Sequence, residues 1–243
     1  MAASVEIRCP DGVADALLAR PRGEPRGGVL LVMDAFGLRP AVEELVDRVA
    51  AGGYVVLAPN VFYRAGASPL LSPDEIRDRE RAFEKIRPLM EQLTPERIRA
   101  DGAGYLDELA ARSGADRAAI TGYCMGGRLG WWIAAAYPDR VAALGAFHTG
   151  GLVADGEDSA HRAADGLATV ELYFGFADQD RNMTPEQIEA LEQALDAAGV
   201  VYRAEVYEGA LHGYTMSDLP VFDEAARDRH HRELAALLER ALG

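Results

Sequence analysis

The sequence predicts an α/β fold, in which helices cover both faces of a central, mostly parallel sheet, within one domain spanning residues 1–243. Short runs rich in Val, Leu, Ile and Tyr alternate with longer amphipathic stretches, the pattern of parallel strands joined by covering helices. The short runs are nearly continuously apolar, as is typical of strands buried on both faces. No linker, internal repeat or low-complexity tract divides the chain, which favours a single domain.

The strands are expected in a regular order along the chain. The first 20 residues suggest a hairpin that turns at Pro10-Asp11-Gly12, because these residue types adopt the backbone angles of tight turns. The six central strands expected after this hairpin are Val29 to Met33, Tyr54 to Ala58, Ala118 to Thr121, Val141 to Phe147, Thr169 to Phe174 and Val201 to Tyr207.

The helices between these strands carry recognisable start signals. Ser72-Pro73-Asp74-Glu75 and Thr184-Pro185-Glu186-Gln187 each have the pattern of a capping box with Pro at the first helical position, and Thr94-Pro95-Glu96 is a weaker start. Further helices are expected over Pro40 to Ala51, Gly126 to Tyr137 and Phe222 to Leu242. The irregular segment Asn60 to Leu71 is expected to border a binding site, because long loops in compact domains often do.

The charge balance restricts the classes of partner. Acidic side chains outnumber basic ones by 39 to 25, giving a formal net charge of -14, so nucleic acid and anionic membranes would be repelled. The N-terminal residues lack the positive flank and apolar stretch of a secretory signal, and no run of about 18 apolar residues occurs. We therefore expect a cytoplasmic protein, monomeric or homodimeric, that acts on a small molecule.

The strongest chemical signal is the segment I-T-G-Y-C-M-G-G-R-L-G at 120 to 130, where a strand is expected to end and a helix to begin. A nucleophile flanked by small residues at two positions on either side, here Gly122 and Gly126, is typical of a nucleophile elbow. The helix N-terminus favours an anionic sulfur, so Cys124 is expected to be a reactive nucleophile. The alternative is a small buried side chain at a tight turn. Cys9 has no such setting and is expected to be inert.

A nucleophile of this kind requires a base and an acid, which follow the elbow in that fold on later strand-to-helix loops. The segment F-G-F-A-D-Q-D-R offers Asp178 and Asp180, and E-G-A-L-H-G-Y offers His212. Both segments follow expected strands at the carboxyl edge of the sheet, where open α/β sheets bind ligands. The sequence therefore predicts a Cys, His and Asp triad, with the identity of the acid open.

The other histidines are weaker candidates for the base. His161 lies in a polar stretch, and His230 and His231 lie in the C-terminal amphipathic helix, so all three are expected on solvated surfaces. His148 follows the strand after the elbow helix, in a loop that should open beside the elbow. His148 is therefore a candidate for substrate contact, with a structural role as the alternative.

Taken together, several motifs resemble those of the dienelactone hydrolase family, also called carboxymethylenebutenolidases, over nearly the whole chain. They are V-M-D-A-F-G-L at 32 to 38, Y-V-V-L-A-P-N at 54 to 60, G-Y-C-M-G-G at 122 to 127, the D-Q-D loop, and G-A-L-H-G at 209 to 213. The resemblance implies an α/β-hydrolase fold. It also implies that esters or lactones are cleaved through a thioester acyl-enzyme, with no metal or organic cofactor.

Carried over by position, the resemblance makes Cys124 the nucleophile and His212 the base. Asp180 is favoured as the acid because it keeps the family's spacing to the Thr184-Pro185 helix start, whereas Asp178 matches a plain G-x-x-D pattern. The resemblance also implies an oxyanion hole formed by the backbone N–H groups of Ala35 and Met125. Asp34 occupies the place of a carboxylate that modulates the resting cysteine.

The resemblance further implies a substrate contact from Arg79, and Tyr123 and His148 are further candidates for substrate contact. Arg77 and Arg81 lie close enough to confuse the register of Arg79, and a solvated helix face is the alternative interpretation of all three arginines. A second family arginine should follow the catalytic His, but the sequence there is H-G-Y-T-M. Ester chemistry is therefore expected, and dienelactone itself is not.

Two rival interpretations stay open on the sequence. One is a non-catalytic binding or redox-sensing module that uses Cys124 as an oxidisable thiol, although such a module has no need of His212. The other is a hydrolase that acts on thioesters or peptides, because the fold does not fix the substrate.

Overall fold

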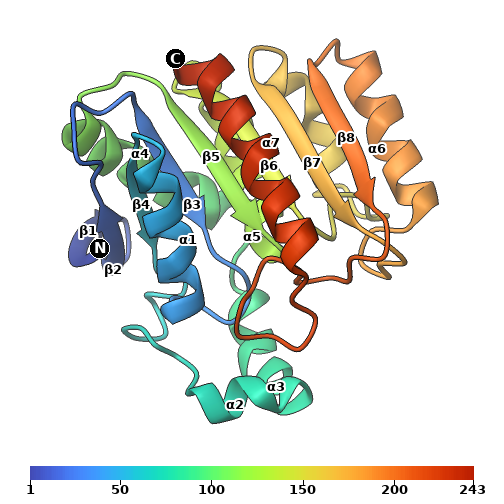
Figure 1. Cartoon of the computed structure of the whole chain (residues 1–243). Helices are drawn as coiled ribbons and strands as arrows, with labels where there is room; N and C mark the ends of the chain where they lie inside the picture. The colour runs from blue at the N-terminus through green and yellow to red at the C-terminus, as the bar shows by residue number, and fades with distance from the viewer.

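The computed structural model describes residues 1–243 as one eight-stranded sheet with strand order β1-β2-β4-β3-β5-β6-β7-β8 (Figure 1). Strand β2 pairs antiparallel with both β1 and β4, and all the other pairings are parallel. The predicted α/β fold with a mostly parallel sheet is therefore confirmed. The strands are β1 (Ala3–Cys9), β2 (Gly12–Ala19), β3 (Gly28–Val32), β4 (Val55–Pro59), β5 (Ala118–Tyr123), β6 (Val141–Phe147), β7 (Glu171–Ala177) and β8 (Tyr202–Tyr207).

Helices cover both faces of this sheet. Figure 1 shows α1 and α7 across the face nearest the viewer, while α4 and α5 lie behind it. The short helices α2 and α3 project beyond the carboxyl ends of the strands. The helices are α1 (Pro40–Ala51), α2 (Pro73–Arg77), α3 (Arg79–Met90), α4 (Pro95–Ser113), α5 (Met125–Ala136), α6 (Pro185–Ala197) and α7 (Glu224–Leu242), with a 3-10 segment at Ala160–Leu167. None of them combines the length and apolar character needed to span a membrane.

The predicted helix starts are confirmed by backbone hydrogen bonds. The side chains of Ser72 and Thr184 each accept the backbone N–H of the residue three positions on. The side chains of those residues, Glu75 and Gln187, accept the backbone N–H of Ser72 and Thr184, so both capping boxes form. Thr94 caps α4 by accepting the N–H of Arg97. The helix predicted from Pro40 to Ala51 has these bounds in the structure.

The last strand differs from its prediction. The apolar run from Val201 to Tyr207 suggests a strand buried on both faces, but β8 is the edge of the sheet and pairs only with β7. Val206 is 47% exposed as a result. An edge strand pairs on one side only, so more of its surface is exposed to solvent. No local sequence pattern shows which strand lies at the edge of a sheet.

Candidate active site

Cys124 stands at a sharp turn between β5 and α5. Its φ of +54° and ψ of -118° lie outside the regions that residues other than glycine ordinarily occupy, and such strain is concentrated at functional sites. A Cβ on Gly122 would lie 2.3 Å from the carbonyl oxygen of Gly126, and one on Gly126 would lie 2.2 Å from the carbonyl oxygen of Val32. Only glycine fits at these two positions, as the elbow pattern requires.

Three side chains meet at this turn from three separate loops. His212 Nε2 lies 3.0 Å from Cys124 Sγ, and His212 Nδ1 lies 2.5 Å from Asp180 Oδ2. Asp180 follows β7 and His212 follows β8, so both loops leave the carboxyl edge of the sheet. Asp180 Oδ1 also accepts hydrogen bonds from the backbone and side-chain N–H groups of Asn182, which fix the carboxylate.

Asp178 occupies a different position from Asp180. Its carboxylate accepts the backbone N–H of Gly209, and its own N–H donates to the carbonyl of Ala210. These bonds join the β7 and β8 loops without reaching the imidazole of His212.

The charges around His212 determine where its proton is held. Burial would lower the pKa of His212, but the charge of Cys124 and the hydrogen bonds with Asp180 and Cys124 outweigh burial and raise it to about 10. Burial would likewise raise the pKa of Asp180, but the hydrogen bond and charge of His212 and the bonds from Asn182 lower it. The arrangement therefore favours a protonated imidazole beside the carboxylate of Asp180.

The other cysteine has the opposite environment. Burial, followed by the charge of Asp101, raises the pKa of Cys9 to about 11, so this thiol stays protonated near neutral pH.

Two backbone N–H groups near the sulfur have no acceptor in the protein. Ala35 lies in the loop after β3, and Met125 is the first residue of α5. Ala35 lines the same cavity as Cys124. Unpaired donors beside a nucleophile are what an oxyanion hole requires.

The cavity above Cys124 is narrow and mostly apolar. Its walls include Phe36 and Leu219, together with Arg79 and Phe83 from α3. Arg79 forms no ion pair or hydrogen bond within the protein, so its guanidinium is available to a ligand. The prediction that residues 60 to 71 border this cavity is wrong, because α3 supplies that wall.

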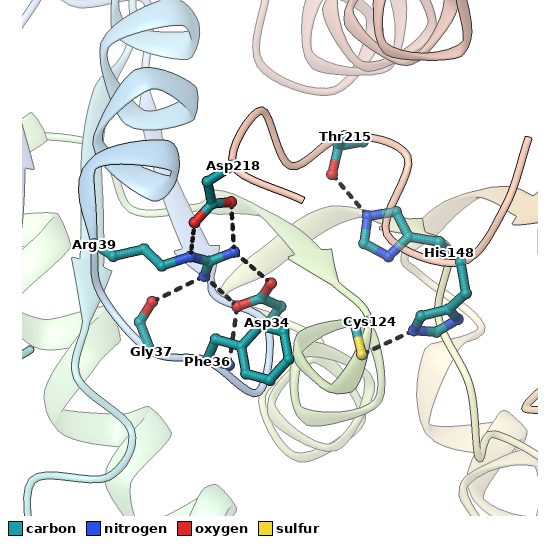
Figure 2. A network of polar contacts seen from close by, with 9 residues as sticks. Asp34, Phe36, Gly37, Arg39, Cys124, His148, Thr215 and Asp218 are labelled. Carbon is teal, nitrogen blue, oxygen red and sulfur yellow. Dashed lines mark hydrogen bonds and ion pairs between the residues drawn. The ribbon is translucent and has the colours of Figure 1, made fainter. Parts of the chain in front are cut away.

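Asp34 lies in the cavity wall, but its carboxylate is engaged by Arg39 (Figure 2). Arg39 Nη1 lies 2.6 Å from Asp34 Oδ1, and Nη2 lies 2.9 Å from Oδ2. No hydrogen bond joins Asp34 to Cys124 in this structure. The expectation that Asp34 acts directly on the resting cysteine therefore needs correction, since the short Asp side chain is held by the guanidinium instead.

His148 lies beside His212 in the same cavity, with the two ring centroids 5.4 Å apart. It is fully buried, and its Nε2 lies 2.7 Å from Thr215 Oγ1 (Figure 2). Burial, followed by the charge of His212, lowers the pKa of His148 well below its usual value. His148 therefore offers a neutral ring to the cavity.

Tyr123 is the sequence-predicted residue that lies away from the cavity. Its ring is fully buried and its hydroxyl lies 2.9 Å from His230 Nε2, under α7. The prediction that Tyr123 contacts substrate is corrected accordingly, because the side chain points to the opposite face of the sheet from the elbow helix. His230 is also fully buried, so the prediction of a solvated role for it is wrong.

Four residues that shape the site were not predicted from the sequence. Arg39, Asn182 and Thr215 each bond a residue of the cavity or the triad from a loop at the carboxyl edge, and Asp218 bonds Arg39. The position of Arg39 directly before Pro40, at a helix start after β3, was the one available signal. Nothing in the sequence indicated its partners.

Known proteins resemble this chain over most of its length. The family model described as "Dienelactone hydrolase family" matches residues 14–242. A "Putative carboxymethylenebutenolidase" of Methylorubrum extorquens is 31% identical over 236 residues, covering 94% of this chain and 77% of the relative, and one of Salmonella typhi is 30% identical over 230 residues, covering 90% and 80%. The crystal structure of a "Putative Dienelactone Hydrolase" from Klebsiella pneumoniae superposes with a TM-score of 0.85 at 24% identity, covering 99% of this chain and 98% of that one. This structural likeness shows the α/β-hydrolase fold.

Proposed function

This chain belongs to the dienelactone hydrolase family and is a carboxylic-ester or lactone hydrolase, and we propose that it cleaves its substrate through a thioester formed on Cys124. The observation that carries the proposal is the continuous contact from Cys124 Sγ through His212 to Asp180, at 3.0 Å and 2.5 Å. Nucleophile, base and orienting acid in this order are the requirements of acyl transfer.

In the first half of the reaction, His212 takes the proton of Cys124, the sulfur attacks the carbonyl carbon, and the carbonyl oxygen becomes an oxyanion. The N–H groups of Ala35 and Met125 are the proposed donors to this oxyanion, and a donor of this type contributes about 3 to 4 kcal/mol to the transition state. The intermediate then collapses, the carbon–oxygen bond breaks, and protonated His212 gives its proton to the leaving alkoxide.

In the second half, His212 takes a proton from water, whose oxygen attacks the thioester carbonyl. Collapse of the second oxyanion breaks the carbon–sulfur bond and releases the acid, and His212 returns its proton to the sulfur of Cys124. Asp180 holds the imidazole in the tautomer that both halves need, with Nδ1–H directed at the carboxylate. A lactone would leave as a single hydroxy acid, because its alkoxide stays attached to the acyl group.

We propose that Arg79 and His148 contact the substrate. Arg79 is a cation without a protein partner in the cavity wall, so it suits a polar or anionic group on a small ester. His148 presents a neutral ring beside His212. The narrow, mostly apolar walls favour a small acyl group over a peptide.

A substrate panel tests the proposal. Wild-type protein and the Cys124→Ala variant are assayed on p-nitrophenyl esters, lactones and acyl thioesters, with circular dichroism to show that the variant is folded. We expect wild-type turnover of esters or lactones and its loss in the folded variant. Turnover that survives in the variant would refute the role of Cys124. A wild-type protein that cleaves nothing in the panel would favour a thiol module without hydrolase activity.

A further inference from the structure

We propose that Arg39 is a positioning residue of the hydrolase reaction, which neutralises Asp34 and fixes the oxyanion-hole loop against the loop that follows His212. This inference rests on the proposed function, since it concerns how the N–H of Ala35 is presented to substrate.

Arg39 lies between two carboxylates, those of Asp34 and Asp218, which come from different loops (Figure 2). Its two Nη atoms donate to Asp34. Its Nε lies 2.7 Å from Asp218 Oδ2, and its Nη2 also lies 3.2 Å from Asp218 Oδ1. The side chains of Arg39 and Asp34 are 2% and 5% exposed. Two bidentate pairs on one buried guanidinium hold both partners in a defined geometry.

The Asp34 carboxylate in turn controls the backbone around Ala35. Asp34 Oδ1 accepts the backbone N–H of Phe36 at 3.1 Å. The backbone carbonyl of Asp34 accepts the N–H of Gly37 at 3.3 Å. These bonds fix the turn on the far side of Ala35, while the N–H of Ala35 stays free. The orientation of the proposed oxyanion donor therefore depends on where Arg39 holds Asp34.

Asp218 extends the same constraint to the other wall. It lies in the loop after His212, next to Leu219, which lines the cavity together with Gly213. Arg39 thus joins the loop after β3 to the loop after β8, although these strands lie at distant places in the sheet. The oxyanion donor and the base are positioned through one side chain.

The charge of Arg39 has a second consequence. Asp34 precedes the proposed oxyanion donor by one residue and lines the cavity with Cys124. A carboxylate there, if left unpaired, would oppose the negative charge that develops on the substrate oxygen. Arg39 cancels that charge, so its loss should slow the acyl-transfer step even if the loop kept its shape.

Arg64 provides a matched control at a distance from the site. It is a partly buried arginine that also bridges two carboxylates, Asp101 at 2.7 Å and Asp11 at 2.7 Å, but it holds the segment after β4 against the N-terminal hairpin. A general effect of breaking a buried ion pair should appear equally in Arg64→Met and Arg39→Met.

The test compares turnover with thiol labelling. We expect Arg39→Met to lower kcat on a p-nitrophenyl ester about 100-fold, the cost of losing one oxyanion-hole donor, with a smaller change in KM. Labelling of Cys124 by iodoacetamide builds no oxyanion and should slow much less.

The double variant Asp34→Asn with Arg39→Met removes the unpaired carboxylate and keeps an acceptor for the N–H of Phe36. We expect it to have a kcat about tenfold higher than that of Arg39→Met alone. Arg64→Met should keep kcat within about twofold while lowering the midpoint of urea unfolding.

Three results would overturn the inference: an unchanged kcat in Arg39→Met, a fall in labelling as large as the fall in kcat, or no recovery in the double variant. If Arg39→Met does not fold, Asp218→Asn takes its place, with an expected loss of about fivefold in kcat at unchanged labelling, and an unchanged kcat overturns the inference. The proposed function fails separately, through ester turnover that survives in Cys124→Ala.

Discussion

His212 and His230 are both largely enclosed imidazoles, yet their surroundings shift their pKa values in opposite directions. His212 lies at the carboxyl edge of the sheet between Asp180 and Cys124, and its pKa rises to about 10. His230 lies on the buried face of α7, against the hydroxyl of Tyr123 and the ring of Phe147, and burial lowers its pKa well below the usual value. One region holds a proton on its imidazole and the other excludes it.

The difference shows what makes a buried histidine chemically useful. Burial alone disfavours the charged ring, as it does at His230. At His212 a carboxylate and a sulfur within hydrogen-bond distance offset that penalty, so the ring can give and take a proton. The catalytic candidate is therefore distinguished by its neighbours at the strand ends and not by its own burial.

Exchanging each histidine for glutamine should give the largest contrast. We expect His212→Gln to lower kcat on an activated ester at least about a thousandfold, because the variant has no base, and to slow the alkylation of Cys124 near pH 7. His230→Gln should keep kcat within about threefold while lowering the midpoint of urea unfolding, because a fully buried side chain is disturbed. A folded His230→Gln protein that loses turnover as fully as His212→Gln would break the comparison.

The two aspartates of the D-Q-D loop, Asp178 and Asp180, allow a second comparison between a neighbour of His212 and a residue that does not contact it. Asp180→Asn should lower kcat about 100-fold to 10,000-fold, because the imidazole loses the partner that fixes its tautomer. Asp178→Asn removes only an acceptor for the backbone of Gly209, so a change of less than about fivefold is expected. Equal losses from the two variants, measured on the same ester, would argue against Asp180 as the orienting acid.

The smallest expected effect concerns His231 in α7 and the free energy of unfolding at acid pH. Burial, followed by the charges of Arg48 and Arg227, lowers the pKa of His231 to about 4, below its unfolded value near 6.5. As the pH falls from 6.5 to 4 the unfolded chain binds a proton that the folded chain does not, so the free energy of unfolding decreases. In His231→Asn the free energy of unfolding should fall by about 1 kcal/mol less over this pH range, a figure reduced for the partial exposure of the ring.

Urea unfolding of wild-type protein and His231→Asn at pH 7 and pH 4.5 measures this slope. Identical slopes in the two proteins would show that His231 is protonated in the folded state at acid pH.

Much of the fold and of the triad geometry could be predicted from the sequence because both depend on local patterns. Short segments are enough to predict the capping boxes at Ser72 and Thr184 and the glycines around Cys124, because these features depend on the local backbone alone. Parallel strands bring their carboxyl ends to one edge, so the strand-end positions of Asp180 and His212 already implied proximity.

The rest depends on which face a side chain takes and what lies across from it. Thr121 and Tyr123 are two residues apart in β5 and share a face, where their hydroxyls lie 3.3 Å apart, so Tyr123 points under α7 and not into the cavity. The partners of Arg39 are 5 and 179 residues away, a pairing that no local pattern encodes. The edge position of β8 likewise follows from strand order alone.

The most direct test of the account is to find where the acyl group resides during turnover. Wild-type protein is mixed with a p-nitrophenyl ester, quenched in acid within the burst phase, and digested for peptide mass mapping. The account predicts a burst of p-nitrophenol equal to the enzyme concentration and an acyl group on Cys124 that hydroxylamine removes. Turnover with Cys124 unmodified, or an acyl group on another residue, would contradict it.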